Sequence, residues 1–178
     1  LSPVRSNLVN WYDFDHNSTI LEIGTGCGAI TEALLENIDE SITLHALELS
    51  KRRAKINAHR NKSYSNLEVL VGNMEHLGTS KKYDYIVCVG VLEYAGKYIS
   101  GADPFNSFLA NLQSLLNPGG ELLLAIENKL GLKYISGSRE DHTGLFFESL
   151  MSYPQYKGIR TFSKSELVSM LEAAKFTS

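Results

Sequence analysis

The chain has 178 residues, of which 43% are hydrophobic and 21% charged, and a formal net charge of −3. This composition predicts one folded domain, and the slight acidity argues against a dedicated nucleic-acid binder, which usually carries a basic field. No apolar run is long enough to predict a membrane span. The two cysteines, Cys27 and Cys88, lack the spacing of a disulfide framework, which favours the cytoplasm.

Short apolar runs alternate with helical segments along the chain. Strands are predicted at residues 19–24, 42–49, 67–72, 83–92 and 121–127. Helices are predicted at residues 29–38, 50–61, 104–116 and 163–176, with Ser50 as an N-cap and Ser163 and Glu166 as a capping box. The "NPGG" residues at 117–120 are predicted as a turn and 128–161 as an irregular stretch. The alternation predicts a Rossmann-like α/β fold, with a doubly wound, mostly parallel sheet that is covered on both faces. In such sheets ligands bind beyond the carboxyl ends of the strands.

The stretch "LEIGTGCGAIT" places Gly24, Gly26 and Gly28 directly after the first predicted strand. Glycine is costly inside regular structure, so three alternating glycines predict that a ligand approaches the backbone closely. The helix that follows points its free N–H groups into the same space. A tight turn without a ligand is one alternative. A dinucleotide turn, which Gly24, Gly26 and Ala29 satisfy loosely, is another.

Glu22 stands two residues before Gly24, which gives the pattern E-x-G-x-G-x-G. This pattern resembles motif I of class I S-adenosylmethionine-dependent methyltransferases. The resemblance implies that the Glu22 carboxylate holds the glycine loop through backbone N–H groups and faces the cationic methionine end of the cofactor. It continues in order through "HALELS", "VGNMEHL" and "VGVLEY" and covers residues 19–127.

The same resemblance assigns roles to residues after the later strands. Glu48 would accept hydrogen bonds from the ribose hydroxyls, and Asn73 and the Met74 backbone would meet the adenine. Asn73 stands where the family often has Asp. The full set of cofactor-binding residues expected for S-adenosylmethionine is Glu22, Gly24, Thr25, Gly26, Gly28, Glu48, Leu49, Asn73, Met74 and Gly90. The implied strand order is 3-2-1-4-5, with the family's sixth and seventh strands missing from this chain.

A finer resemblance is to bacterial methyltransferase domains that lie beside glycosyltransferase modules in cell-surface polysaccharide proteins. It is carried by residues 1–12, 48–61, 126–144 and 158–167. It implies a saccharide or saccharide-linked acceptor, and fusion to or association with glycosyltransferase modules. We expect a small-molecule or glycan acceptor as the partner, and no nucleic acid.

We expect residues 1–178 to form a single methyltransferase domain. Residues 18–127 would form the cofactor-binding core, residues 128–160 an acceptor loop or lid, and residues 163–176 the last helix. The chain lacks an initiator Met and stops where a sixth strand would begin, so we expect it to be a piece of a longer protein.

Methyl transfer to a hydroxyl benefits from a general base near the transferred group. His142 is the leading candidate because imidazole titrates near neutral pH, and either Asp141 or Glu127 would orient it. The alternative is that His142 is a surface residue that only shapes its loop. Tyr94 occupies a position where many family members have His. The five histidines are scattered without ligand spacing, so no metal is expected.

Three functions therefore stay open. The first is S-adenosylmethionine-dependent O-methylation of a small acceptor. The second is a catalytically silent module that keeps the cofactor fold and binds partners. The third is an NAD-dependent oxidoreductase, although the chain shows no distinct catalytic constellation of that class.

Overall fold

The computed structural model describes residues 3–77, 81–156 and 158–177 and divides into two compact units. The first unit comprises Leu1–Val89 and Ser114–Ala125, and the second comprises Gly90–Gln113 and Ile126–Ser178. The division cuts the expected core, because the chain leaves the first unit after the fourth strand and returns before the fifth.

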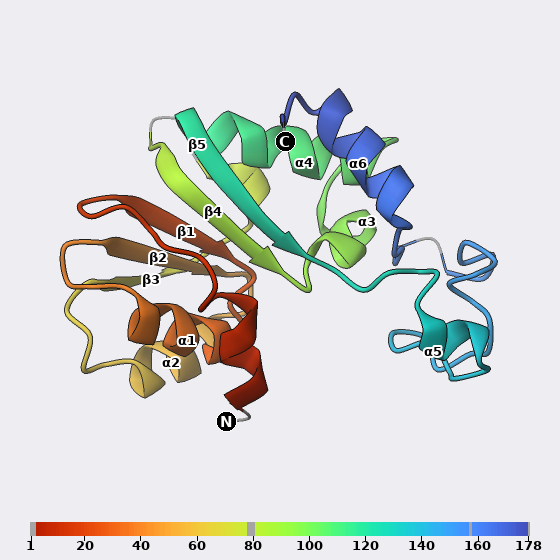
Figure 1. Cartoon of the computed structure of the whole chain (residues 1–178), viewed down its shortest axis with the longest axis horizontal. Coiled ribbons are helices and arrows are strands. Elements are labelled where there is room, and N and C mark those ends of the chain that lie inside the picture. The colour runs from red at the N-terminus through yellow and green to blue at the C-terminus, as the bar shows by residue number, and fades with distance from the viewer. Residues whose placement is uncertain (1–2, 78–80, 157, 178) are drawn as a thin grey trace. The chain divides into compact units, whose positions relative to one another are not determined.

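The first unit is built on a five-stranded sheet (Figure 1). Its strands are β1 (Thr19–Ile23), β2 (Thr43–Glu48), β3 (Leu67–Val71), β4 (Tyr83–Val89) and β5 (Leu116–Ala125). All four strand pairs are parallel and the order is β3-β2-β1-β4-β5, which confirms the predicted Rossmann-like fold. The carboxyl ends of all five strands therefore meet at one edge of the sheet.

The fifth strand begins earlier than predicted. The "NPGG" residues lie inside β5 instead of forming a turn, because Leu116 already pairs with Tyr83 and an irregularity follows between Tyr83 and Tyr85. A Cβ on Gly120 would come within 2.9 Å of the Asp84 carbonyl oxygen. Close backbone approach, not reversal of the chain, therefore explains this glycine.

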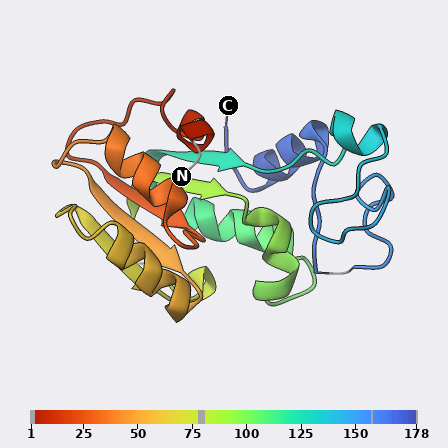
Figure 2. The same cartoon turned by 90° about the horizontal axis from the view of Figure 1, so that it is seen from below.

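The helices of the first unit are η1 (Pro3–Leu8), α1 (Ala29–Asn37), α2 (Lys51–Arg60) and η2 (Met74–His76). Figures 1 and 2 show α1 and α2 on the same face of the sheet. Ser50 caps α2 by accepting a hydrogen bond from the Arg53 N–H, as predicted. The core of this unit consists of Val9, Ile20, Ala33, Leu34, Leu35, Ile42, Leu44, Tyr85 and Val87.

The second unit contains short helices and a long connecting segment. Its helices are η3 (Leu92–Tyr94), α3 (Ala95–Tyr98), α4 (Pro104–Leu115, whose last two residues belong to the first unit), α5 (Leu132–Ile135) and α6 (Lys164–Ala173). Ser163 and Glu166 form the predicted capping box at the start of α6. None of the helices described has the length and apolar character needed to cross a membrane.

Candidate active site

The glycine loop follows β1 in the first unit. Its Gly24 and Thr25 N–H groups donate to the Leu47 carbonyl at 2.8 and 3.2 Å, which ties the loop to the end of β2. Gly26 has a φ of +56°, and a Cβ built on it would meet nothing within 4 Å. The backbone at Gly26 therefore borders open space and fits the cradle that a cofactor would fill.

Glu48 ends β2 and is buried beside this loop. Its Oε2 accepts the Gly26 N–H at 2.8 Å, and its Oε1 accepts the Ser50 N–H at 2.8 Å. Arg53 Nη2 lies 2.8 Å from the same Oε1. Glu48 thus holds the glycine loop in place, while its Oε2, with one donor, keeps capacity for a further one. We did not predict Arg53 as its partner.

The expected hydrogen bonds from the glycine-loop N–H groups to Glu22 are not found. Its buried carboxylate accepts a hydrogen bond from the Thr31 hydroxyl at 2.6 Å, and burial raises the pKa of Glu22 to about 8. Glu48, not Glu22, binds the loop N–H group of Gly26. Glu22 therefore fixes the first turn of α1 behind the loop.

Gly28 and Thr25 are held by a buried pair of asparagines on and after α2. A Cβ on Gly28 would lie 2.3 Å from Asn57 Oδ1, so this glycine makes room for a side chain of the protein itself. Asn57 also donates to the Thr25 and Thr31 hydroxyls at 2.9 Å, and Asn61 donates to the Gly28 carbonyl at 3.4 Å. Gly28 was expected to make room for the cofactor, but the space beside it is occupied by Asn57.

The remaining cofactor candidates follow neighbouring strands. Leu49 comes after β2 and is half-exposed, and Asn73 and Met74 come after β3, which pairs with β2. The Asn73 side chain accepts the Glu75 N–H at 3.1 Å and so begins η2, while Met74 is buried. Gly90 follows β4 and belongs to the second unit, with a φ of +66°.

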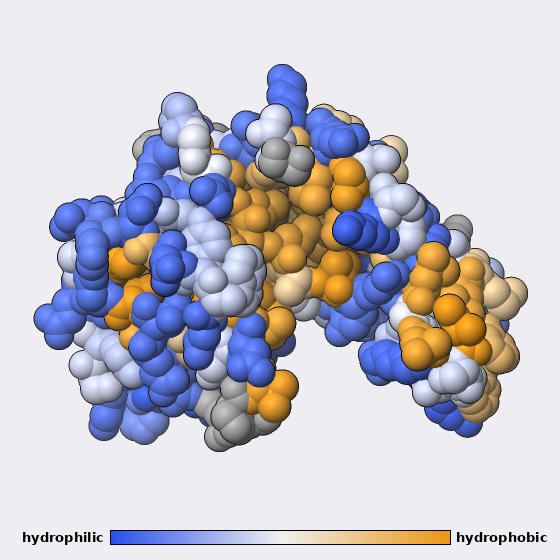
Figure 3. Space-filling model, viewed as in Figure 1, coloured by the Kyte–Doolittle hydropathy of each residue, from blue (hydrophilic) through white to orange (hydrophobic). Residues whose placement is uncertain are grey.

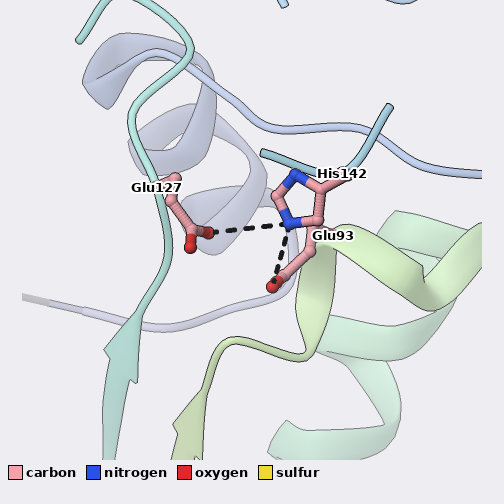
Figure 4. A group of neighbouring side chains, drawn as sticks. All are labelled: Glu93, Glu127 and His142. Carbon is pink, nitrogen blue, oxygen red and sulfur yellow. Dashed lines mark ion pairs between the residues drawn. The ribbon is translucent and has the colours of Figure 1, made fainter. Parts of the chain in front are cut away.

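His142 lies in the second unit among three carboxylates. Its side chain is buried, and its Nδ1 is 2.6 Å from Glu140 Oε1. On the other side of the ring, Nε2 is 3.7 Å from Glu93 Oε1 and 4.0 Å from Glu127 Oε2 (Figure 4). The Glu93, Glu140 and Glu127 carboxylates together raise the pKa of His142 to about 9, against the opposing effect of burial.

Glu140 is the residue that orients His142. Burial by itself would raise the pKa of Glu140, but hydrogen bonds from His142, the Tyr153 hydroxyl and the Thr143 N–H lower it. The His142 N–H also donates to Glu140, at 2.8 Å. The acceptor of Nδ1 is thus a fully bonded, ionised carboxylate. Glu140 and Glu93 were not predicted as site residues, although "REDHT" places Glu140 where its carboxylate can accept the next N–H groups of its own loop.

Asp141 does not hydrogen-bond His142. Its carboxylate pairs with the Lys133 ammonium and the Tyr134 hydroxyl, and the bond from Lys133 lowers the pKa of Asp141. Glu127 lies near Nε2 rather than Nδ1, with its side chain 40% exposed. The Tyr94 ring packs edge-on against the imidazole at 5.3 Å, and burial raises the pKa of Tyr94.

The segment around this cluster is packed locally, although it contains little regular structure. Tyr134, Tyr153 and Thr161 are buried in it. Figure 3 shows an apolar area at the place of α5. Several large apolar side chains of residues 130–151 are exposed: Leu130, Leu132, Ile135, Phe146, Phe147 and Met151. Phe146 and Phe147 are both about half-exposed.

Comparison with known proteins places the chain among methyltransferases. Among curated proteins, it is 22% identical over 142 residues to a "Ubiquinone biosynthesis O-methyltransferase" of Rickettsia canadensis, covering 77% of this chain and 56% of that protein. The chain thus spans little more than half the length of this relative.

Two solved structures share the fold. A putative methyltransferase of Bacillus halodurans matches with a TM-score of 0.66 and 19% identity over 96% of this chain and 67% of that one. The structure described as "PigF with SAH" matches with a TM-score of 0.68 and 22% identity over 99% of this chain and 50% of that one.

The sequence also matches a family model directly. The model described as "Methyltransferase domain" matches residues 21–122, which include the glycine loop, Glu48 and all five strands except the ends of the first and last. The chain therefore belongs to the family of class I S-adenosylmethionine-dependent methyltransferase domains.

Proposed function

We propose that this chain transfers the methyl group of S-adenosylmethionine to a hydroxyl of a small, saccharide-like acceptor. The observation that carries the proposal is the buried Glu140–His142 pair, whose Nε2 is turned toward Glu93 and Glu127. A silent binding module has no need for a buried imidazole that a carboxylate holds in one orientation. The oxidoreductase alternative also lacks support, because the chain matches a methyltransferase family.

The first unit supplies the residues that would hold the cofactor. The open backbone at Gly26, the Glu48 carboxylate and the exposed Leu49 side chain fit a nucleoside with a ribose diol and an apolar base face. When bound, S-adenosylmethionine supplies a methyl group activated by a positively charged sulfur. Glu48 would bind the ribose hydroxyls while it keeps the loop N–H of Gly26 in place.

The second unit supplies the group that accepts a proton. In the reaction, the acceptor oxygen bonds to the methyl carbon as the carbon–sulfur bond breaks, and the electron pair of that bond stays on sulfur. The hydroxyl proton passes to His142 Nε2, which Glu140 leaves available by binding Nδ1–H. Asp141 supports the loop through Lys133 and Tyr134, and Glu127 lies on the Nε2 side.

The acceptor class rests on the likeness of residues 126–144 and 158–167 to methyltransferase domains of polysaccharide proteins. The same likeness supports fusion to, or association with, glycosyltransferase modules. The free thiols of Cys27 and Cys88 support a cytoplasmic location.

The proposal is tested by incubating the protein with S-adenosylmethionine labelled in the methyl group and with a panel of saccharides, followed by mass spectrometry of the products. Label is expected on a sugar oxygen with the parent protein and not with His142→Gln. Binding of S-adenosylmethionine without transfer to any hydroxyl would instead support a silent module, and transfer by His142→Gln at the parent rate would exclude His142 as the base.

A further inference from the structure

Two carboxylates beside His142 each have a buried oxygen that accepts no hydrogen bond from the residues described. Glu93 Oε2 and Glu127 Oε2 are both buried and form no hydrogen bond to any residue that the structure describes. The Glu93 residue is only 2% exposed. A buried polar atom without a partner is costly, so native structures rarely keep one unless a ligand bonds to it.

The charge of the cluster is also uncompensated. The His142 imidazolium and the Glu140 carboxylate balance one another, which leaves Glu93 and Glu127 as two negative charges. Over residues 3–77, 81–156 and 158–177, no Lys or Arg forms an ion pair with either. The basic residues near the cluster have other partners. Lys129 and Arg160 pair with Glu166, and Lys133 pairs with Asp141. Lys97 lies over the Tyr94 ring, and Arg139 lies over the Phe146 ring. The cluster therefore favours a cation.

The spacing indicates what kind of cation fits. His142 Nε2 lies 3.7 Å from Glu93 Oε1 and 4.0 Å from Glu127 Oε2, and the three atoms all lie within 4.8 Å of one another. These separations are too long for direct hydrogen bonds. They also exceed the roughly 3–3.4 Å between neighbouring ligands of an ion with bonds of about 2.0–2.1 Å, such as Mg²⁺ or Zn²⁺.

A tetrahedral ammonium group suits this spacing better. N–H donors about 2.9 Å from their acceptors place those acceptors about 4.7 Å apart. Figure 4 shows Glu93 and Glu127 directed toward the same side of the imidazole ring. A group with several N–H donors could therefore bridge both carboxylates without moving either backbone, and it would donate to the two unpartnered oxygens.

We infer that Glu93 and Glu127 form a subsite for a primary ammonium group of the acceptor, next to the hydroxyl that is methylated. The acceptor class is then a vicinal amino alcohol, such as an amino sugar. This inference rests on the proposed function and makes it more specific. The positive charge of the bound ammonium lowers the affinity of the imidazole for a proton, so that His142 Nε2 loses its proton and can take up the proton of the hydroxyl.

Binding tests the subsite directly. With the protein saturated with S-adenosylhomocysteine, the His142 ring resonance is followed by NMR during titration with glucosamine and 2-aminoethanol, and with their neutral isosteres glucose and ethylene glycol. The amines are expected to shift the His142 resonance at concentrations about tenfold or more lower than the isosteres, because charge-assisted hydrogen bonds strengthen their binding. Glu93→Gln and Glu127→Gln should lose this preference, and Glu172→Gln, which removes an exposed charge on α6, should keep it.

Several outcomes would overturn the subsite. They are equal responses to amines and isosteres, no response to either amine, or a preference that survives in both Glu93→Gln and Glu127→Gln. A response to Mg²⁺ or Mn²⁺ at lower concentrations than to the amines would identify a metal site instead.

Product analysis separates this inference from the proposed function. O-methylation of amino sugars in preference to neutral sugars supports both. O-methylation of both kinds at the same rate keeps the proposed function and overturns the subsite. Methylation of the amine nitrogen keeps the subsite and overturns the hydroxyl as the acceptor.

Discussion

The Glu140 carboxylate holds the His142 imidazole from behind, with Oε1 2.6 Å from Nδ1, and both side chains are buried. Because Nδ1 is the donor in this pair, Nε2 is the nitrogen that faces Glu93 and Glu127. Glu140 in turn receives hydrogen bonds from Tyr153, Thr143 and the His142 backbone. The imidazole is thus fixed in orientation before any acceptor binds, which is what a positioned base requires.

The first prediction concerns the base. His142→Gln keeps a side-chain amide near Glu140 but cannot take up a proton, so kcat/KM for methyl transfer should fall by about a hundredfold or more. Asp141→Asn is the matched control, because Asp141 bonds Lys133 and Tyr134 and not His142. Its kcat/KM should stay within about threefold of the parent. Equal losses in the two variants would show that the loop, and not the imidazole, matters.

The second prediction is a pH profile. The carboxylates of Glu93, Glu140 and Glu127 raise the pKa of His142 to about 9 against the effect of burial, and the Tyr94 ring packs on the imidazole. A base must be neutral, so kcat/KM should rise with pH with a midpoint at about 9 and level off above it, because kcat/KM reports the free enzyme. Glu93→Gln removes a negative charge and should shift the midpoint to lower pH. A profile with the same midpoint in Glu93→Gln would contradict this origin of the shift.

The third prediction compares the stability cost of a side-chain clash at Gly28 with that of backbone strain alone at Gly137. Gly28 and Gly137 have φ values of +84° and +88°, but only Gly28 has a neighbour, Asn57 Oδ1, 2.3 Å from an added Cβ. Both substitutions to Ala strain the backbone by about 1–2 kcal/mol. Gly28→Ala should lower the free energy of unfolding by about 1–3 kcal/mol more than Gly137→Ala, as measured by urea titration. Equal losses would mean that Asn57 moves aside freely.

The fourth prediction links Glu22 to stability. Burial raises its pKa from 4.5 to about 8, so the folded protein holds a proton that the unfolded chain releases. The stability that this bound proton gives the folded protein is fully present below the pKa of the unfolded chain and is lost as pH rises through about 8. The free energy of unfolding should therefore fall less between about pH 5 and about pH 9 in Glu22→Gln than in the parent. Glu36→Gln removes an exposed carboxylate of α1 and should behave as the parent does. If Glu22→Gln kept the parent's full pH dependence, the buried carboxyl would not be its source.

Much of the sheet could be predicted because its strands are continuous apolar runs bounded by Gly, Ser and Asn. The start of β5 could not, because "NPGG" reads as a turn, and only its pairing with Tyr83 in the folded chain holds it in the sheet. Local signals also located the two helix caps, Ser50 and Ser163, because a cap depends only on residues next to it.

The site was also predictable only in part, because some of its features are local in the sequence and others arise only in the folded chain. The glycine loop is local, and its position could be read from spacing. Which carboxylate bonds to which partner depends on tertiary packing. Glu48 accepts the loop N–H expected to bond to Glu22, and Glu140 binds the imidazole expected to bond to Asp141 or Glu127. Glu93, 49 positions before His142 in the chain, approaches it only in the fold.

Cofactor binding is the fifth prediction and the most direct test of the central claim. Titration calorimetry with S-adenosylmethionine, S-adenosylhomocysteine and NAD should show binding of the first two and not of NAD. Glu48→Ala should weaken that binding by about 1–3 kcal/mol through lost charged hydrogen bonds. Gly26→Val should abolish it, while Gly119→Val, also at positive φ with nothing within 4 Å of an added Cβ, should preserve it. Binding of NAD in place of S-adenosylmethionine, or undiminished binding by Gly26→Val, would contradict the assignment of this loop as the cofactor site.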